Sequence, residues 1–315
     1  MLSPCRGKYQ RLLTKGVKLG TVDIWFVNLG IKITDLQKSF SIGNFSIAYY
    51  GMILGSGVLF GLLVATIIAK KNGENPEVYL DLAIYGTIFG ILCARTYYVA
   101  FSWDYYRNNL LEIFNLRGGG IAMYGSAIGA VLTVVVYSRI KKLNFGQLCD
   151  TASCGLITGQ IVGRWGNFVN CEAFGGYTDN LLAMRLNVDK VHSYMISQEL
   201  ADKMITVDGV NYIQVHPTFL YESLWNLGVL IIMILFTKHK RWNGEVFCLY
   251  LIGYGIGRFW IEGLRTDQLQ IGDTGIAISQ VVALVTAAVG ALLIVYNRRR
   301  KAAAKAALAE ENEKE

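Results

Sequence analysis

Three long stretches of the chain are apolar and contain no charged side chain. They are residues 45–69, 118–138 and 274–297. A helix needs about 20 predominantly apolar residues to cross the hydrocarbon core of a membrane, and each stretch is long enough. The chain as a whole is 53% hydrophobic and only 17% charged, whereas soluble domains average about 25% charged residues. These features exclude an ordinary soluble fold and predict a membrane protein.

Four further apolar runs are each interrupted by one or two charged side chains. They are residues 82–101 with Arg95, 151–171 with Arg164, 219–237 with Glu222, and 246–264 with Arg258 and Glu262. Together the seven runs predict an all-α polytopic membrane protein with about seven transmembrane helices. Four of these helices fall in residues 45–171 and three in residues 217–297.

Lys and Arg are concentrated in alternate connections between the runs. Basic clusters follow the first, third, fifth and seventh runs, at residues 70–71, 139–142, 238–241 and 298–301. Basic connections stay in the cytoplasm. The alternation therefore predicts that the tail at residues 298–315 is cytoplasmic and that the N-terminus lies outside.

Residues 1–44 do not fit this pattern, because they are also rich in Lys and Arg. We expect this N-terminal extension to lie on the outer lipid surface, where basic side chains meet anionic headgroups. The alternative is a start codon assigned too far upstream.

The connection between the fourth and fifth runs, residues 172–216, is longer and more polar. Within residues 205–215, apolar and polar side chains alternate on both sides of Asp208–Gly209, a pair typical of a β-hairpin turn. Residues 191–204 are predicted to form a short helix. We expect a small α+β extracytoplasmic cap here; the alternative is a loop without a role of its own.

The charged side chains in or beside the apolar runs indicate a polar cavity. A charge at bilayer depth costs about 2.5–3.5 kcal/mol, so such residues pair with one another or face a cavity. Arginines outnumber carboxylates in this set, which favours a cavity that binds an anion. Pairing that merely joins helices is the alternative. The set is Arg95, Arg164, Glu172, Glu222, Arg258, Glu262 and Arg265.

One helix is expected to present Arg258, Glu262 and Arg265 on a single stripe. Their spacing is i, i+4, i+7, which places side chains on one helical face. Glu262 would then bridge the two arginines and orient them. Because a guanidinium group binds two phosphate oxygens through its planar fork, the stripe suits a phosphate.

The segment GRWGNFVNCEAFGG, residues 163–176, ends the fourth run with polar side chains. Arg164 and Asn167 have i, i+3 spacing and are expected on one helical face. Asn170 and Glu172 follow where the helix is predicted to end. For Asn170, a plain helix-capping role is an equally good interpretation.

The glycine-rich segment RGGGIAMYG, residues 117–125, is expected to open the third helix. It lacks the GK[ST] of a phosphate-binding P-loop and follows no predicted strand. Its backbone N–H groups at a helix start can still meet an anion. Tyr124 lies in this segment, and its alternative role is that of an interfacial aromatic.

The six cysteines show no CxxC pair and no metal-binding spacing. Most lie in apolar runs, where Cys behaves as a small hydrophobe. Cys171 is the exception, because it lies inside the polar segment that ends the fourth run.

The segment GRWGNFVNCEAFG, residues 163–175, resembles the signature of prolipoprotein diacylglyceryl transferases, which are bacterial membrane enzymes. Four other blocks resemble that family in the same order, from residue 38 to residue 297. They are IAYYGMILG (47–55), GILCARTYYVAF (90–101), HPTFLYES (216–223) and GRFWIEGLRTD (257–267).

The resemblance implies transfer of the diacylglyceryl group of phosphatidylglycerol to the lipobox cysteine of a preprolipoprotein signal peptide, in the bacterial cell (inner) membrane. It implies neither a metal nor another cofactor, because the lipid carries its own leaving group, and no nucleic-acid partner. The matching positions imply the catalytic residues Arg164, Arg258, Tyr124, Glu172 and Glu262. They also imply the substrate-binding residues Tyr50, Arg95, Asn167, Asn170, Gly175 and Arg265.

The chain departs from the family pattern at Tyr124, where some members carry His. The general base therefore stays open among Glu172, Glu262 and Tyr124. A membrane transporter of an anionic solute is the alternative function, although we find none of the internal repeats that such proteins show. A purely structural membrane scaffold would leave the buried charges unexplained.

Overall fold

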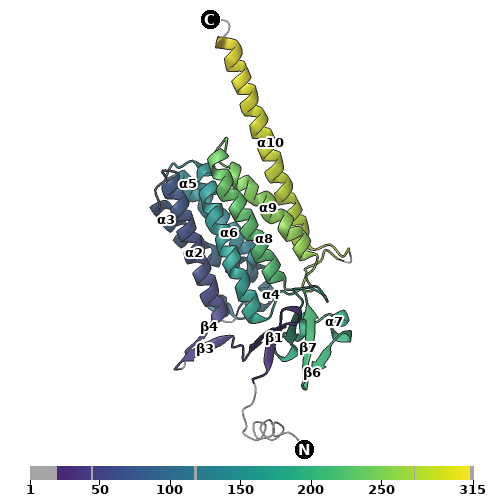
Figure 1. Ribbon diagram of the computed structural model, residues 1–315. Coiled ribbons are helices and arrows are strands. Elements are labelled where there is room, and N and C mark those ends of the chain that lie inside the picture. Colours follow the sequence, from purple (N-terminus) through teal and green to yellow (C-terminus); the bar gives the residue numbers. More distant parts are fainter. Residues whose placement is uncertain (1–19, 44, 117–118, 273, 313–315) are drawn as a thin grey trace, which may run out of the picture. The chain divides into compact units, whose positions relative to one another are not determined.

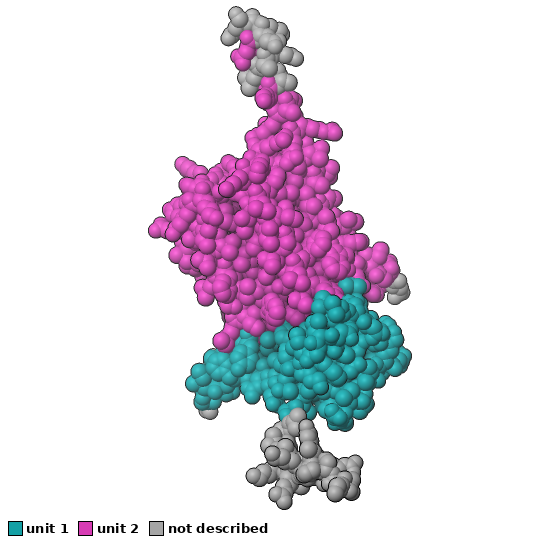
Figure 2. Space-filling model, viewed as in Figure 1, with its two compact units in different colours: residues 1–49, 167–218, 264–267 teal, residues 50–166, 219–263, 268–315 magenta. Residues whose placement is uncertain are grey.

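The computed structural model describes residues 20–43, 45–116, 119–272 and 274–312. The chain divides into two compact units (Figure 2). Unit 1 comprises Met1–Tyr49, Asn167–Thr218 and Leu264–Asp267, and unit 2 comprises Tyr50–Gly166, Phe219–Gly263 and Gln268–Glu315. The boundary falls within the last turn of one long helix, so this helix contributes residues to both units.

Unit 2 is a helical bundle whose long helices coincide with the seven predicted runs (Figure 1). Short helices lie in the connections. The elements are α2 (Tyr49–Lys71), α3 (Glu77–Phe101), α4 (Trp103–Tyr106), η2 (Leu110–Phe114), α5 (Met123–Ile140), α6 (Phe145–Asn170), α8 (Thr218–Phe236), η5 (Thr237–His239), α9 (Glu245–Glu262) and α10 (Ile278–Asn312).

Among the described residues, five helices are long and apolar enough to cross a membrane: α2, α3, α5, α8 with η5, and α10. Helices α6 and α9 have comparable lengths of 26 and 18 residues, but they are more polar. Their polar character has a plain source, because Asp150 and Arg164 lie in α6 and Glu245, Arg258 and Glu262 lie in α9. Helix α9 thus carries three charged side chains within 18 residues, and α6 carries two within 26.

Helix α6 lies at the centre of the apolar packing in unit 2. Its Cys154 and Ile157 are fully buried in one core with side chains of α2, α8 and α9. Helices α2 and α6 meet backbone to backbone, because a Cβ atom added at Gly61 would lie only 2.5 Å from the carbonyl oxygen of Gly155. Small residues allow such close contact between membrane helices.

Unit 1 contains a five-stranded antiparallel sheet of order β2-β1-β5-β7-β6 and a separate β3-β4 ribbon. The predicted hairpin is confirmed: β6 and β7 pair around Asp208–Gly209, whose φ angles are 52° and 78°. The strands are β1 (Val22–Phe26), β2 (Ile31–Thr34), β3 (Ser39–Ile42), β4 (Phe45–Ala48), β5 (Met184–Asn187), β6 (Ile205–Val207) and β7 (Val210–Val215).

Short helices complete unit 1. They are η1 (Val27–Leu29), η3 (Val188–Lys190), η4 (Ser193–Met195) and α7 (Gln198–Asp202). The helix predicted over residues 191–204 is therefore two shorter pieces, η4 and α7. The Ser197 hydroxyl accepts the backbone N–H of Leu200 at 3.4 Å and begins α7 separately.

One domain boundary in the structure differs from the boundary predicted from the sequence. Strands β1 and β2 belong to the segment interpreted as a separate N-terminal extension, yet β1 pairs with β5 of the predicted cap. Asp23 in β1 is fully buried, accepts the N–H of Leu36 at 2.6 Å, and lies 3.5 Å from the Nζ of Lys190. Residues 20–48 are thus an integral part of unit 1. The basic residues before them lie outside the described residues.

Candidate functional site

Four buried side chains of alternating charge form a chain across three helices of unit 2. Arg164 is in α6, Glu222 in α8, and Arg258 and Glu262 in α9. One carboxylate oxygen of Glu222 contacts the Nε of Arg164. The other oxygen accepts a hydrogen bond from Nη1 of Arg258 at 2.6 Å. Arg258 Nη2 contacts Glu262. We call these four residues the charged quartet.

The charged quartet is nearly closed to solvent. The exposed fractions of the side chains are 17% for Arg164, 6% for Glu222, 10% for Arg258 and 5% for Glu262. A charge at such a position is tolerated only when it is paired and hydrogen-bonded. The two arginines and two glutamates balance when all four are ionised. The excess of arginine inferred from sequence therefore does not apply to this cluster.

Glu222 is the central member of the quartet, and sequence reasoning did not assign it to the site. Its position in an apolar run marked it as a buried charge, and it lies within HPTFLYES. The sequence did not indicate that one carboxylate would hold both arginines. The i, i+4 pairing of Arg258 with Glu262 is confirmed.

Arg164 presents hydrogen-bond donors that the quartet does not use. Among the described residues, Arg164 makes an ion pair with Glu222 through Nε. This pair does not use the two Nη groups, while the carboxylate fixes the plane of the guanidinium. A planar fork fixed in this way suits two oxygens of one phosphate group.

Aromatic side chains of α8 and α9 pack beside the quartet. Trp225 and Trp260 meet edge to face with ring centroids 5.9 Å apart, and the indole N–H of Trp225 donates to the Gly253 carbonyl at 2.8 Å. A Cβ atom at Gly257 would lie 2.2 Å from the Trp225 ring, so glycine is required directly before Arg258. The Trp225 ring therefore fixes the packing of α8 against α9 next to Arg258.

The end of α6 is built by backbone geometry. Cys171 has a left-handed φ of 53°, its N–H donates to Phe168 at 3.1 Å, and the N–H of Glu172 donates to Asn167 at 3.0 Å. This pair of bonds is a Schellman motif, with Cys where glycine is usual. The amide of Asn167 also donates to the Glu172 carboxylate at 2.9 Å. Asn170 is the last helical residue, as predicted.

Cys171 is 2% exposed, and burial raises the pKa of its thiol to about 11. The thiol is therefore protonated at neutral pH. This state argues against a nucleophilic role and favours the interpretation of Cys171 as a buried, structural residue.

Gly175 and Arg265 lie together in unit 1. They form an isolated β-bridge, and the N–H of Gly175 donates to the His216 carbonyl at 3.0 Å. A Cβ atom at Gly175 would lie 2.8 Å from both the Cβ of His216 and the Leu264 carbonyl. Arg265 contacts Asp267 with two hydrogen bonds of 2.9 and 2.7 Å. Helix α9 ends at Glu262, so the expected helical stripe does not reach Arg265.

Arg95 has a different environment from the quartet. Its guanidinium donates to five backbone carbonyls of the segment that follows α3, at distances of 2.5 to 3.1 Å. The residue is 6% exposed, and its guanidinium carbon lies 5.1 Å from the centre of the Tyr106 ring. All five N–H donors of Arg95 are thus engaged in holding the connection between α3 and α5. The carbonyls belong to Glu112, Ile113, Asn115, Gly119 and Gly120.

Two tyrosines complete the set of predicted site residues. The ring of Tyr50 lies against the backbone of Gly166, where an added Cβ would be 2.7 Å from it. Tyr124 is half-buried at the second position of α5, within the glycine-rich segment. Among the described residues no contact joins Tyr124 or Arg95 to the quartet. The structure therefore brings together Arg164, Arg258 and Glu262 within unit 2. The predicted residues Asn167, Asn170, Glu172, Gly175 and Arg265 belong to unit 1.

A family model described as prolipoprotein diacylglyceryl transferase matches residues 37–296 of the chain. This range includes the charged quartet, the end of α6 and the Gly175–Arg265 bridge.

Several curated proteins are similar to this chain over most of its length. A phosphatidylglycerol–prolipoprotein diacylglyceryl transferase of Clostridioides difficile (strain 630) is 40% identical over 260 residues, which is 82% of this chain and 94% of the relative. A protein of the same name from Bacillus cytotoxicus is 40% identical over 248 residues (79% and 87%). One from Listeria innocua is 43% identical over 255 residues (81% and 87%).

Proposed function

Because the chain belongs to the prolipoprotein diacylglyceryl transferase family, we propose that it transfers the diacylglyceryl group of phosphatidylglycerol to the lipobox cysteine of a preprolipoprotein. The sulfur forms a thioether with the glyceryl carbon, and glycerol phosphate leaves. The single observation that carries this proposal is the charged quartet, in which carboxylates orient two buried arginines.

The quartet suits the charge that develops during the reaction. When the thiolate attacks the glyceryl carbon, the carbon–oxygen bond to phosphate breaks and its electron pair leaves with the phosphate. Arg164 and Arg258 stabilise that charge, because donors already fixed in place need no reorganisation in the transition state. Glu222 and Glu262 hold the guanidinium planes. The same positive groups favour the thiolate form of the incoming cysteine.

Glu262 acts chiefly as an orienting group in this proposal. Its carboxylate contacts Arg258 at i, i+4 spacing and holds the guanidinium in place. Glu172 accepts an amide N–H from Asn167, and Tyr124 lies outside the quartet contacts. We assign none of the three as the general base in this proposal. Proton transfer to water in the field of the arginines is consistent with this arrangement.

We further propose that α6 and α9 also cross the membrane, which gives seven spans in the bacterial cell membrane with a cytoplasmic C-terminus. The support is the alternation of basic connections along the sequence. Single cysteines at Asp208 and Lys305, in a background without native cysteines, test this topology with an impermeant thiol reagent on intact cells. Labelling at position 305 but not at position 208 would reverse the orientation.

The alternative function, transport of an anionic solute, gains no support. The relatives described above all carry the transferase name.

A direct assay tests the proposed activity. Purified protein is mixed with phosphatidylglycerol and a peptide that contains a lipobox, and the peptide is analysed by mass spectrometry. We expect a mass gain of one diacylglyceryl group on the cysteine. A peptide with Ser in place of the cysteine and a reaction with phosphatidylethanolamine are the controls, and neither should give product.

Arg258→Ala should abolish the mass gain, while Asp104→Ala, whose side chain is 92% exposed, should keep it. No mass gain by the parent protein, or full activity of Arg258→Ala, would refute the proposal.

A further inference from the structure

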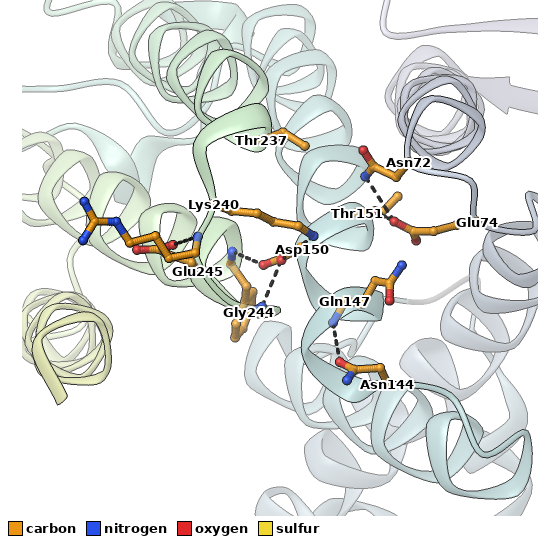
Figure 3. Close-up of polar contacts among 12 residues, drawn as sticks. Asn72, Glu74, Asn144, Gln147, Asp150, Thr151, Thr237, Lys240, Gly244 and Glu245 are labelled. Atoms are coloured by element: carbon orange, nitrogen blue, oxygen red, sulfur yellow. Dashed lines mark hydrogen bonds and ion pairs between the residues drawn. The ribbon is translucent and has the colours of Figure 1, made fainter. Parts of the chain in front are cut away.

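A second buried polar cluster lies at the end of unit 2 where α6 and α9 begin (Figure 3). Its centre is Asp150 of α6, which is 3% exposed. One carboxylate oxygen accepts the backbone N–H of Gly244 at 2.9 Å and the Nζ of Lys240 at 3.2 Å. The other oxygen accepts the N–H of Phe247 at 2.9 Å. Asp150 therefore joins α6 to the first turn of α9.

The start of α9 explains why this carboxylate is needed. The first N–H groups of a helix have no partner within the helix, and a side chain at the N-cap position usually accepts one of them. In α9 the N-cap residue is Gly244, which has no side chain. Asp150 takes over the cap from a different helix. Gly146 makes room for this contact, because a Cβ atom there would lie 2.2 Å from the Asn243 carbonyl.

A second carboxylate fixes the same turn from the other side. Glu245 is fully buried and accepts the N–H of Arg241 at 2.6 Å and the Nε of Arg298 at 2.7 Å. Arg298 lies in α10. The start of α9 is thus held by α6 on one side and by α10 on the other, so its position along the bundle is fixed.

The charged quartet joins the same two helices at a second level. Arg164 lies 14 residues after Asp150 in α6, and Arg258 lies 14 residues after Gly244. At a rise of about 1.5 Å per residue, both distances along the helix are about 21 Å. Glu222 contacts both arginines. The two helices are therefore parallel, and equal lengths separate the cap from the quartet.

We propose that Asp150 is a positioning residue that sets the axial register of Arg258 against Arg164. The proposal rests on the proposed function, in which both arginines meet the phosphate of the donor lipid. Without the hydrogen bonds of Asp150, the start of α9 is no longer anchored to α6. The Arg258 guanidinium can then shift along the helix axis relative to the Arg164 guanidinium. Stabilisation of one phosphate by both guanidinium groups depends on this alignment.

The expected effect is on turnover rather than on lipid affinity. A displacement of about 1 Å at a reacting group can lower a rate by about 100-fold. Asp150→Ala removes all three acceptor contacts, and we expect kcat to fall by about 10- to 100-fold while KM for phosphatidylglycerol changes by less than about threefold. Asp150→Asn keeps one oxygen for the backbone N–H groups and should recover part of kcat.

Asp81→Ala is the matched control. Asp81 accepts the Tyr137 hydroxyl at 2.6 Å and joins α3 to α5, so its loss also removes a polar contact between helices of unit 2. It has no part in the cap or in the quartet. Asp81→Ala should lower Tm to a similar extent as Asp150→Ala but leave kcat within about twofold, because α6 and α9 keep their register.

A distance measurement separates this proposal from the proposed function. Spin labels at Leu156 and Ile256, exposed positions of α6 and α9, report the register by pulsed electron paramagnetic resonance in a background without native cysteines. In Asp150→Ala the distance distribution should shift or broaden, and in Asp81→Ala it should match the parent.

Parental kcat in Asp150→Ala, an unchanged distribution, or an equal loss of kcat in Asp81→Ala would each overturn the proposal. If Asp150→Ala does not accumulate, Asp150→Asn is measured in the same way, and parental values again overturn it. Failure of the proposed function would appear separately, as full activity in Arg258→Ala.

Discussion

Arg95 and Arg164 are both buried arginines in long helices of the same unit, yet the structure uses them in opposite ways. Arg95 donates to five backbone carbonyls, which belong to a single connection. Arg164 is held through Nε by the carboxylate of Glu222. The first guanidinium has no donor left for a ligand, whereas the second keeps both Nη groups.

The difference between the two residues shows that burial of a charged side chain does not by itself indicate a catalytic or binding role. A guanidinium that donates to several backbone carbonyls stabilises the conformation of that backbone, because each buried carbonyl needs a hydrogen-bond donor. A guanidinium held by a carboxylate is oriented and still able to bind an oxyanion. On this view Arg95 fixes the segment between α3 and α5, and Arg164 is the arginine that we propose binds the substrate.

The largest effect is expected from Arg164. Arg164→Ala removes the free fork and leaves Glu222 with one partner fewer, so we expect kcat/KM to fall by about 1,000-fold or more. Arg164→Lys should recover little of this loss, because an ammonium group cannot bind two oxygens in one plane. The lipidation assay measures both. If Arg164→Lys kept most of the activity, charge alone would be sufficient and the fork would not matter.

The next effect is expected from Glu222, which tests whether the orienting carboxylate matters. Glu222→Ala leaves two buried arginines without their shared partner, which costs about 3–5 kcal/mol of stability. Activity should fall by about 100-fold. Glu222→Gln keeps an acceptor oxygen and should lie between parent and Ala. Thermal unfolding in detergent and the lipidation assay, measured together, check both parts. A stable and fully active Glu222→Ala protein would contradict the model.

Arg95→Ala should lower stability more than turnover, which is the opposite of the effect expected for Arg164→Ala. Five buried carbonyls lose their donors, and we expect a loss of about 3 kcal/mol in stability. Activity of the protein that remains folded should fall by no more than about tenfold, with the loss concentrated at higher temperature. Measuring kcat at two temperatures beside Tm checks this. A loss as large as that of Arg164→Ala in a protein with parental Tm would give Arg95 a direct role at the substrate.

The smallest effect is expected from Tyr124. Tyr124→Phe removes only the hydroxyl, which we propose donates a hydrogen bond to the lipid headgroup. Loss of one such bond should lower the rate by about tenfold, and raising the pH should not restore it. Tyr124→His should keep appreciable activity. A Tyr124→Phe rate equal to that of the parent across the pH range would leave Tyr124 as an interfacial aromatic.

Features that depend on local sequence could be predicted well. The seven helical runs, the Asp208–Gly209 hairpin and the end of α6 at Asn170 all follow from patterns within a few residues. The i, i+4 contact of Arg258 with Glu262 belongs to the same class.

Features that depend on distant residues could not be predicted. Glu222 contacts Arg164, 58 residues before it, and Arg258, 36 residues after it. The sequence gives no ranking of the many possible partners of this carboxylate. Strand β1 pairs with β5 across a separation that no local pattern indicates. From the sequence, Arg95 could not be distinguished from Arg164, because both are arginines within apolar runs. The partners of Arg95 are backbone carbonyls, which every residue has, so the side chains of the sequence do not reveal them.

Burial of Cys171 has a consequence for chemical selectivity. An enzyme that alkylates thiols carries thiols of its own, and Cys171 lies within the polar segment that ends α6. With a pKa of about 11, only about one Cys171 side chain in 10,000 is a thiolate at pH 7. Burial and the raised pKa therefore both keep the Cys171 thiol from competing with the proposed substrate thiol.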